Sequence, residues 1–219
     1  KAPAWKTTLS QSLVRFPNLL SGSTLNGIHQ AWVCDITYFW LPSRFAYIML
    51  IEDVYTRLII AALASETLRA EANIAVLAMA LDATRAERDG TRTIHHSDYG
   101  VQYTAREYLA LARTAHMRLS MCAFAYENAY IERAIGTVKN EYLLHRNITT
   151  FSQLKEELAR TVQLYNTERP HQTHPGWMPP SAFAAHVRQL NIEDRPILQV
   201  YDSNDDRAPR KSAVPGGRC

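Results

Sequence analysis

Three apolar segments follow one another in residues 31–64: Ala31-Trp-Val-Cys-Asp-Ile-Thr-Tyr-Phe39, Phe45-Ala-Tyr-Ile-Met-Leu-Ile-Glu-Asp53 and Arg57-Leu-Ile-Ile-Ala-Ala-Leu-Ala64. Together they are rich in Ile, Leu, Val and Tyr, and short stretches separate them, which is typical of β-strands. Because neighbouring strands joined by a few residues pair antiparallel, the three segments predict an antiparallel meander.

The chain beyond the meander alternates between predicted helices and strands. Helices are expected at 68–87, 104–115, 128–144 and 150–165, and short strands at 93–95 and 117–121. Thr104 and Thr150 are each followed three residues later by Glu or Gln, the capping-box pattern of a helix start. This order predicts an α/β fold with a mixed five-stranded sheet flanked by helices. The first strand would be central and can neighbour the fourth, which would bring Asp35 close to Asp98.

Four regions are expected along the chain. They are a basic extended lead-in or linker (1–30), an α/β core (31–166), a Pro-rich extension of the core that ends helical structure (167–190) and a polar flexible tail (191–219). Acidic residues are absent before Asp35, whereas Lys1, Lys6 and Arg15 occur there, so the lead-in suits either contact with DNA phosphates or a solvated linker. The chain begins at Lys1 without Met, and we expect it to be a fragment of a longer protein.

Composition excludes several classes of protein. The 219 residues are 47% hydrophobic and 21% charged with a formal net charge of +3, which is ordinary for a globular domain. The longest apolar stretch is interrupted by Glu52, Asp53 and Arg57, so no membrane span is expected. The three cysteines are odd in number and widely spaced, which argues against a disulfide framework or a zinc site and favours a reducing compartment.

Three carboxylates stand in contexts that favour catalysis. Asp35 lies within an apolar strand, Asp98 lies where a short strand passes into a loop, and Glu132 lies on a predicted helix. Two divalent metal ions need shared carboxylates, and phosphoryl transfer on a nucleic-acid backbone uses such a pair. Taken singly, a buried Asp satisfied by hydrogen bonds and an Asp in a turn would be the ordinary interpretations of the first two.

The helix of Glu132 carries two further informative residues. Gly136 and Lys139 follow at i+4 and i+7, on the same side of the helix as Glu132. Glycine inside a helix costs about 1 kcal/mol relative to alanine. Gly136 therefore suits either the close approach of a DNA strand or a helix–helix crossing. Lys139 suits either a phosphate contact or a solvated position.

Together, the motifs resemble the catalytic domain of DDE transposases and retroviral integrases, which has an RNase H-like fold, and more narrowly the insertion-sequence transposases of the IS-three group. The resemblance covers roughly residues 18–183 and implies that residues 31–166 are an RNase H-like integrase catalytic core. It rests on these stretches in family order: Trp32-Val-Cys-Asp-Ile-Thr-Tyr38, Ile51-Glu-Asp-Val-Tyr-Thr-Arg57, His95-His-Ser-Asp-Tyr-Gly-Val-Gln-Tyr103, Ser120-Met121, Glu127-Asn-Ala-Tyr-Ile-Glu132, Lys139-Asn-Glu141 and Tyr165-Asn-Thr-Glu-Arg-Pro-His171.

The resemblance implies that Asp35, Asp98 and Glu132 form the catalytic triad and bind two Mg²⁺ or Mn²⁺ ions. It implies metal-dependent phosphodiester hydrolysis and DNA strand transfer at insertion-sequence ends. The residues expected to contact nucleic acid are Lys139, Arg133, Arg169 and His171. For Arg169 and His171, bracing of the C-terminal helix is the alternative.

The family also implies partners and a location. DNA (transposon ends and target) would be bound by a homo-oligomer. The protein would be cytoplasmic, bacterial and nucleoid-associated when bound to DNA, with an upstream helix-turn-helix region missing from this chain. Because three carboxylates repel one another, we expect the Glu132 helix to be partly open without metal.

One departure from the family concerns the segment before Glu132. Residues 122–126 make the spacing from Asp98 to Glu132 two residues shorter than is usual, and Glu127 replaces an Asp. Glu127 lies about 140° around the helix from Glu132 and would be a poor substitute for it. Two alternatives therefore stay open: a same-fold nuclease that does not join strands, and a degenerate DNA-binding or assembly module. A two-carboxylate glycosidase is disfavoured, because aromatic sugar platforms are not clustered in the sequence.

Overall fold

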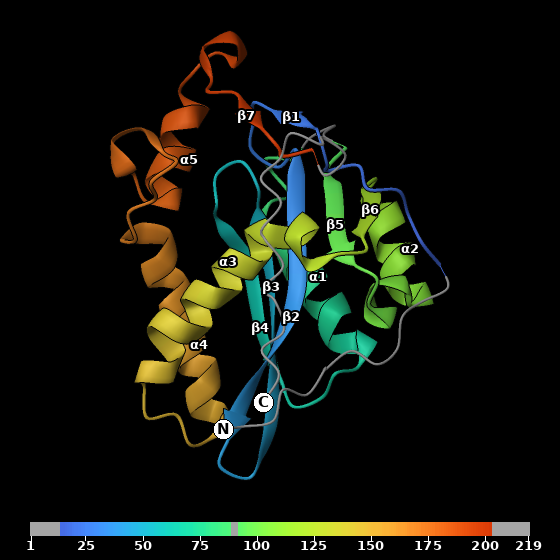
Figure 1. The fold of residues 1–219 in the computed structure, drawn as a ribbon, viewed down its shortest axis with the longest axis vertical. Helices are drawn as coiled ribbons and strands as arrows, with labels where there is room; N and C mark the ends of the chain where they lie inside the picture. The colour runs from blue at the N-terminus through green and yellow to red at the C-terminus, as the bar shows by residue number, and fades with distance from the viewer. Residues whose placement is uncertain (1–13, 89–91, 203–219) are drawn as a thin grey trace, which may run out of the picture.

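A five-stranded sheet forms the centre of the protein in a computed structural model that describes residues 14–88 and 92–202 (Figure 1). Its strands are β2 (Ala31–Leu41), β3 (Arg44–Asp53), β4 (Ile59–Ser65), β5 (Ile94–Asp98) and β6 (Arg118–Cys122), in the order β4-β3-β2-β5-β6. The first three form an antiparallel meander, and β5 and β6 run parallel to β2. The mixed sheet, the central first strand and its pairing with the fourth are therefore confirmed.

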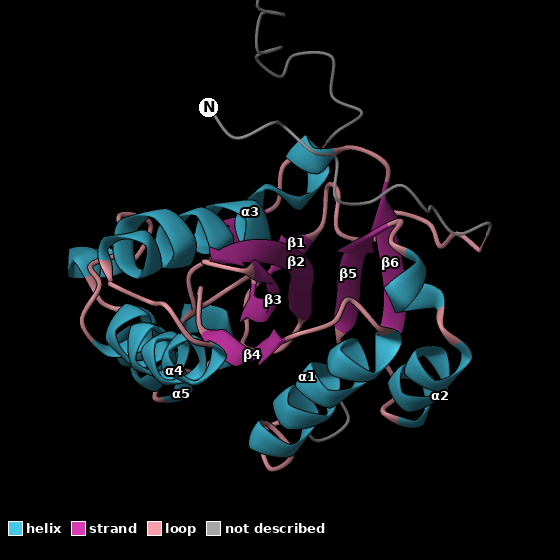
Figure 2. Cartoon of the chain, turned by 90° about the horizontal axis from the view of Figure 1, so that it is seen from below, coloured by secondary structure: helices cyan, strands magenta, loops and turns pink. Residues whose placement is uncertain are grey.

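Helices cover both faces of this sheet (Figure 2). The helix α3 (Ala129–Gly136) lies on one face and continues as a π-helix over Thr137–Tyr142 and a 3₁₀ turn over Leu143–His145. On the other face lie α1 (Ala70–Ala83) and α2 (Arg106–Thr114). A fourth helix, α4 (Phe151–Thr167), packs beside β4. None of the helices within the described ranges is long and apolar enough to cross a membrane.

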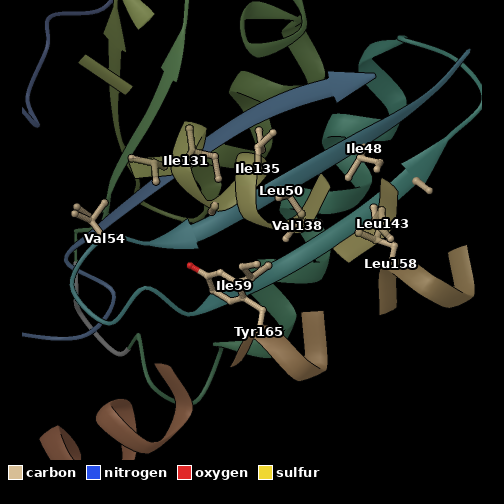
Figure 3. Close-up of a cluster of buried hydrophobic side chains, with 14 of the residues drawn as sticks. Ile48, Leu50, Val54, Ile59, Ile131, Ile135, Val138, Leu143, Leu158 and Tyr165 are labelled. Atoms are coloured by element: carbon tan, nitrogen blue, oxygen red, sulfur yellow. The ribbon is translucent and has the colours of Figure 1, made fainter. Parts of the chain in front are cut away.

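The alternation of side chains along β2 divides the core into two layers. Val33 faces a cluster that includes Leu50 and Ile131 (Figure 3), whereas Trp32 and Cys34 face a second cluster against α1 and α2. Successive side chains on a strand point to opposite faces. The α3 side of β2 therefore also carries Asp35 and Thr37.

The attachment of α3 to the sheet follows from helical spacing. Its buried residues Ile131, Ala134, Ile135 and Val138 recur at i, i+3, i+4 and i+7, so they form one apolar face. Burying an Ile or Val side chain contributes about 1.5–3 kcal/mol. This face fixes the rotation of the helix and leaves Glu132 exposed on its flank.

Only one of the two predicted capping boxes forms. At the start of α4, the Thr150 hydroxyl accepts the Gln153 backbone N–H (3.2 Å) and the Gln153 side chain accepts the Thr150 N–H (3.1 Å). At Thr104 the prediction is wrong, because the hydroxyl donates to the Val101 carbonyl within a 3₁₀ turn over Val101–Thr104. Thr104 therefore ends that turn and does not cap α2, which begins at Arg106.

The C-terminal region is more ordered than its composition predicted. Pro180 does not end helical structure but begins α5 (Pro180–Arg188), where proline at the first position loses no intrahelical hydrogen bond. The expected flexible tail is also wrong for residues 191–202. The short strand β7 (Leu198–Gln199) pairs with β1 (Thr24–Leu25), and Val200 is buried. The segment is ordered because it buries apolar side chains despite its polar composition. Residues 203–219 and 1–13 lie outside the described ranges.

Candidate active site

Asp35 and Asp98 lie on the same face of neighbouring strands. The parallel pairing of β2 with β5 matches Ala31 with Ile94 and ends at Val33 with His96. Continued by two residues, this register sets Asp35 opposite Asp98, on the face that α3 covers. The sheet register thus brings together two carboxylates that are far apart in sequence.

The electrostatics of this pair favour an added cation. Burial and then the charge of Asp98 raise the pKa of Asp35 to about 7, although the carboxylate accepts the Ile36 N–H at 2.7 Å. Burial also raises the pKa of Asp98, and the Gly100 N–H, which donates to Asp98 Oδ1 at 2.9 Å, opposes that rise. Within the described part of the chain, neither carboxylate forms an ion pair with Lys, Arg or His. A divalent cation would relieve this repulsion.

The raised pKa of Asp35 predicts a pH-dependent penalty on stability. An unfolded Asp loses its proton near pH 4 and the folded Asp35 near pH 7, so folding is destabilised as pH rises between these values. We expect Asp35→Asn to be more stable than the wild type at pH 8 by about 2–4 kcal/mol without metal, and about equally stable at pH 4.5. Urea unfolding at both pH values measures the difference.

Buried histidines change the stability of the fold with pH in the opposite direction to Asp35, so the wild type must be compared with the variant at each pH. Burial lowers the pKa of His95 to about 3 and of His96 to about 4, so both destabilise the fold as pH falls below about 6.5. That contribution is common to wild type and variant and cancels in their difference. An equal difference at pH 4.5 and pH 8 would show that Asp35 does not titrate as described.

Glu132 stands apart from the two aspartates. It is exposed on α3, yet its charge is among those that raise the pKa of Asp35, so it lies within electrostatic reach. No group of three His, Cys, Asp or Glu side chains within 14–88 and 92–202 is close enough to hold a metal ion. Mutual repulsion of three carboxylates gives a physical reason for this open arrangement.

The start of α3 is tied to the strand that carries Asp35. Asn128 is buried, and its side-chain amide donates to the Cys34 carbonyl at 3.4 Å, one residue before Asp35. Glu127 accepts the backbone N–H groups of Ala123 and Phe124, both at 3.1 Å. Glu127 thus closes the shortened turn before the helix, which leaves Glu132 as the acidic residue of α3 itself.

Lys139 lies over β2 and contacts Thr37 and Tyr38, which follow Asp35 by two and three residues. Its Nζ is 4.1 Å from the ring centroid of Tyr38 and 3.5 Å from Thr37 Oγ1. Burial lowers its pKa. Lys139 belongs to the π-helical segment, a rare geometry that often occurs at functional sites. Gly136, just before that segment, has no atom within 4 Å of the position where a Cβ would lie, so it marks open space and not a helix crossing.

The other three residues expected to contact nucleic acid lie around the C-terminal end of α4. Arg169 forms a two-point ion pair with Glu141 (2.6 and 3.2 Å), which fastens the π-helical segment to this end. Burial, the neighbouring His174 and the charges of Arg57, Arg169 and Arg133 together lower the pKa of His171 to about 4. Arg133 is exposed on α3. The bracing role therefore has geometric support for Arg169, and the DNA contacts stay predictions.

Two exposed features were not singled out from the sequence. Phe124 and Tyr126 stack on each other before α3, with ring centroids 5.4 Å apart. The guanidinium of Arg15 lies over the ring of Tyr99, next to Asp98, at 4.4 Å. The basic composition of the lead-in pointed to Arg15 in general terms, but its stacking partner is 84 positions away and is not visible as a sequence pattern.

Comparison with known proteins places this arrangement in a class. Two family models, both described as integrase core domain, match residues 26–126 and 120–180. A 31 kDa protein of insertion element IS600 from Shigella sonnei is 31% identical over 188 residues, which cover 84% of this chain and 68% of that protein. The chain belongs to the integrase-core family of insertion-sequence transposases.

Relatives and solved structures agree with this assignment. Transposase InsF of insertion sequence IS3A from Escherichia coli strain K12 is 27% identical, over 70% of this chain and 54% of the relative. The chain therefore spans only about half the length of that transposase. The catalytic core domain of HTLV-2 integrase, solved with magnesium, superposes with a TM-score of 0.55 at 15% identity, covering 76% of this chain and 99% of that one. That likeness confirms the RNase H-like fold.

Proposed function

We propose that this chain is the part of an insertion-sequence transposase that hydrolyses a phosphodiester bond at the element's ends and joins the freed 3′ ends to target DNA. The observation that carries the proposal is the register of β2 against β5. It sets Asp35 and Asp98 side by side on one face of the sheet. Burial raises the pKa of both carboxyl groups there, and neither has an ion-pair partner among the described residues. Family membership supplies the reaction class.

The donor set fits hard divalent cations. Oxygen ligands from carboxylates suit Mg²⁺ or Mn²⁺, and two such ions would take Asp35 and Asp98 as ligands, with Glu132 completing the set. When bound, the ions would activate the attacking oxygen and stabilise the leaving oxygen of an in-line displacement. The chain's own contribution is to fix two of the ligands on a rigid sheet. The third sits on a helix attached by one apolar face.

Basic side chains around the triad would hold the DNA strand. Lys139 lies on the Asp35 side of α3, and exposed Arg133 follows Glu132 directly. Their positive charges suit phosphates next to the scissile bond, where affinity falls as salt rises. The open space at Gly136 would admit the backbone between them. Assembly of a homo-oligomer on two DNA ends is part of the same proposal.

A strand-joining assay tests the proposed function. Labelled, pre-cleaved element ends would be incubated with the chain and Mg²⁺ or Mn²⁺, and nicked and joined products would be separated on a gel. We expect metal-dependent joining that Glu132→Gln abolishes and Glu168→Gln, an exposed carboxylate at the end of α4, leaves intact. Nicking without joining would identify a nuclease. DNA binding with neither product would identify an assembly module.

Gly100 supports Asp98 directly, which gives a sharper test of the site. A Cβ at this position would lie 2.9 Å from Asp98 Oδ1 and 2.9 Å from Gln102 Oε1, so Asp98 would have to turn away. We expect Gly100→Ala to raise the Mg²⁺ concentration for half-maximal joining about tenfold or more, because one displaced ligand weakens metal binding. Gly27→Ala, where the closest atom is 3.4 Å away, is the control. An unchanged Mg²⁺ requirement would remove Asp98 from the metal site.

Gly136 distinguishes a role in DNA binding from a role in folding. The position is helical and sterically free, so Gly136→Ala is expected to stabilise the fold by about 0.5–1 kcal/mol. If a DNA strand crosses here, the same variant joins strands several-fold more slowly. Thermal unfolding and the joining assay measure the two effects. Faster or unchanged joining would show that DNA does not approach this side of α3.

A further inference from the structure

Residues 17–19 of the lead-in lie along the free edge of β6. The Pro17 carbonyl accepts the Met121 N–H at 3.4 Å, and the Leu19 N–H donates to Ser120 Oγ at 2.8 Å. Leu20 is buried in the core. The segment is therefore anchored to the strand next to β5, and residues 14–16 continue toward the end of β5 at which Asp98 lies.

This anchoring places Arg15 near the end of β5, over the residue that follows Asp98. Its guanidinium carbon is 4.4 Å from the centroid of the Tyr99 ring, and Tyr99 directly follows Asp98. The Arg15 side chain is exposed and forms no ion pair with any residue in the described ranges. A stacked guanidinium keeps its edge N–H groups available while the ring limits its motion.

We propose that Arg15 binds a backbone phosphate of the DNA strand that reaches Asp98. This inference rests on the proposed function and adds a contact from outside the segment matched by the integrase core models, which begins at residue 26. The chemistry selects a phosphodiester, because guanidinium N–H groups match phosphate oxygens in two-point hydrogen bonds. The absence of Asp and Glu from the first 34 residues leaves this charge uncompensated by its own segment.

DNA-binding measurements without catalysis test the inference. Fluorescence anisotropy with labelled element ends, in Ca²⁺ so that binding is separated from joining, would be recorded from 50 to 300 mM salt. We expect Arg15→Ala to weaken binding about 5- to 30-fold at low salt and to reduce the slope of log K against log salt by about 1. Arg15→Lys should recover part of the affinity. Arg118→Ala, an exposed arginine at the other end of β6, should match the wild type.

A scan of neutral phosphates locates the contact. Single methylphosphonates would replace each phosphate near the 3′ end. We expect one position at which the methylphosphonate weakens DNA binding by the wild type but does not weaken binding by Arg15→Ala any further. An unchanged salt slope, additive effects at every position, or no salt-dependent binding by the wild type would overturn the inference. If DNA binding depended on Arg15 but no strands were joined, only the proposed function would be refuted. If strands were joined but the effects of Arg15→Ala and of every methylphosphonate on binding added up, only the Arg15 contact would be refuted.

Discussion

Replacement of Asp35 by Asn is expected to lower the rate of strand joining by about 10³-fold or more, since a shared metal ligand contributes several kcal/mol of transition-state stabilisation. Asn keeps the size of the side chain and can still accept the Ile36 N–H. The variant therefore removes the charge but preserves the fold. Single-turnover joining of pre-cleaved ends at saturating Mg²⁺ gives the rate of the chemical step.

The matched control for this variant is Asp82→Asn. Asp82 is exposed on α1 and, among the described residues, pairs with Arg85. Its charge is not among those that shift the pKa of Asp35 or of Asp98. We expect Asp82→Asn to join strands at the wild-type rate. If Asp35→Asn joined strands within tenfold of the wild type, the paired aspartates would not be the metal site, whatever their register.

Removal of Asp53 is expected to have the largest effect on stability, about 3–5 kcal/mol for Asp53→Ala. This carboxylate is fully buried and accepts three hydrogen bonds: the Thr56 N–H and hydroxyl, both at 2.7 Å, and the His29 N–H at 2.8 Å. Its loss leaves buried donors without acceptors. The loss would also free the turn after β3 and the segment that enters β2.

Urea unfolding measures this effect, with Asp82→Ala as the control. An exposed aspartate is expected to change stability by less than about 0.5 kcal/mol. Asp53→Asn retains one acceptor oxygen and should fall between the two. A loss of less than about 1 kcal/mol in Asp53→Ala would mean that the turn forms without the carboxylate, and that this residue has some other role in the family motif.

Much of the sheet was predictable because its signals are local and periodic. The apolar runs of β2, β3 and β4 are joined by short polar turns, so their antiparallel order follows from distance along the chain. The pairing of β2 with β5 is one that the strand order of a mixed sheet allows, and the structure confirms it. The same pairing put Asp35 near Asp98, so this half of the candidate site was visible before any coordinates.

The remaining features depend on contacts that composition does not encode. Pro180 was predicted to end helices, yet a proline can equally occupy the first position of one, and only the burial of Phe183 and Val187 decides between them. The pairing of Leu25 with Leu198 joins segments 173 residues apart, and each strand is too short to show a period. The placement of Arg15 over Tyr99 is another such long-range contact.

The most direct test of the central claim is a crystal of this chain soaked in Mn²⁺ and measured for anomalous scattering. We expect manganese between Asp35 and Asp98, with Glu132 turned inward from its exposed position to complete the site. The Asp35→Asn crystal should lose the peak. Manganese bound away from both aspartates, or a peak that persists with Glu132 still on the outer flank of α3, would contradict a three-carboxylate metal centre.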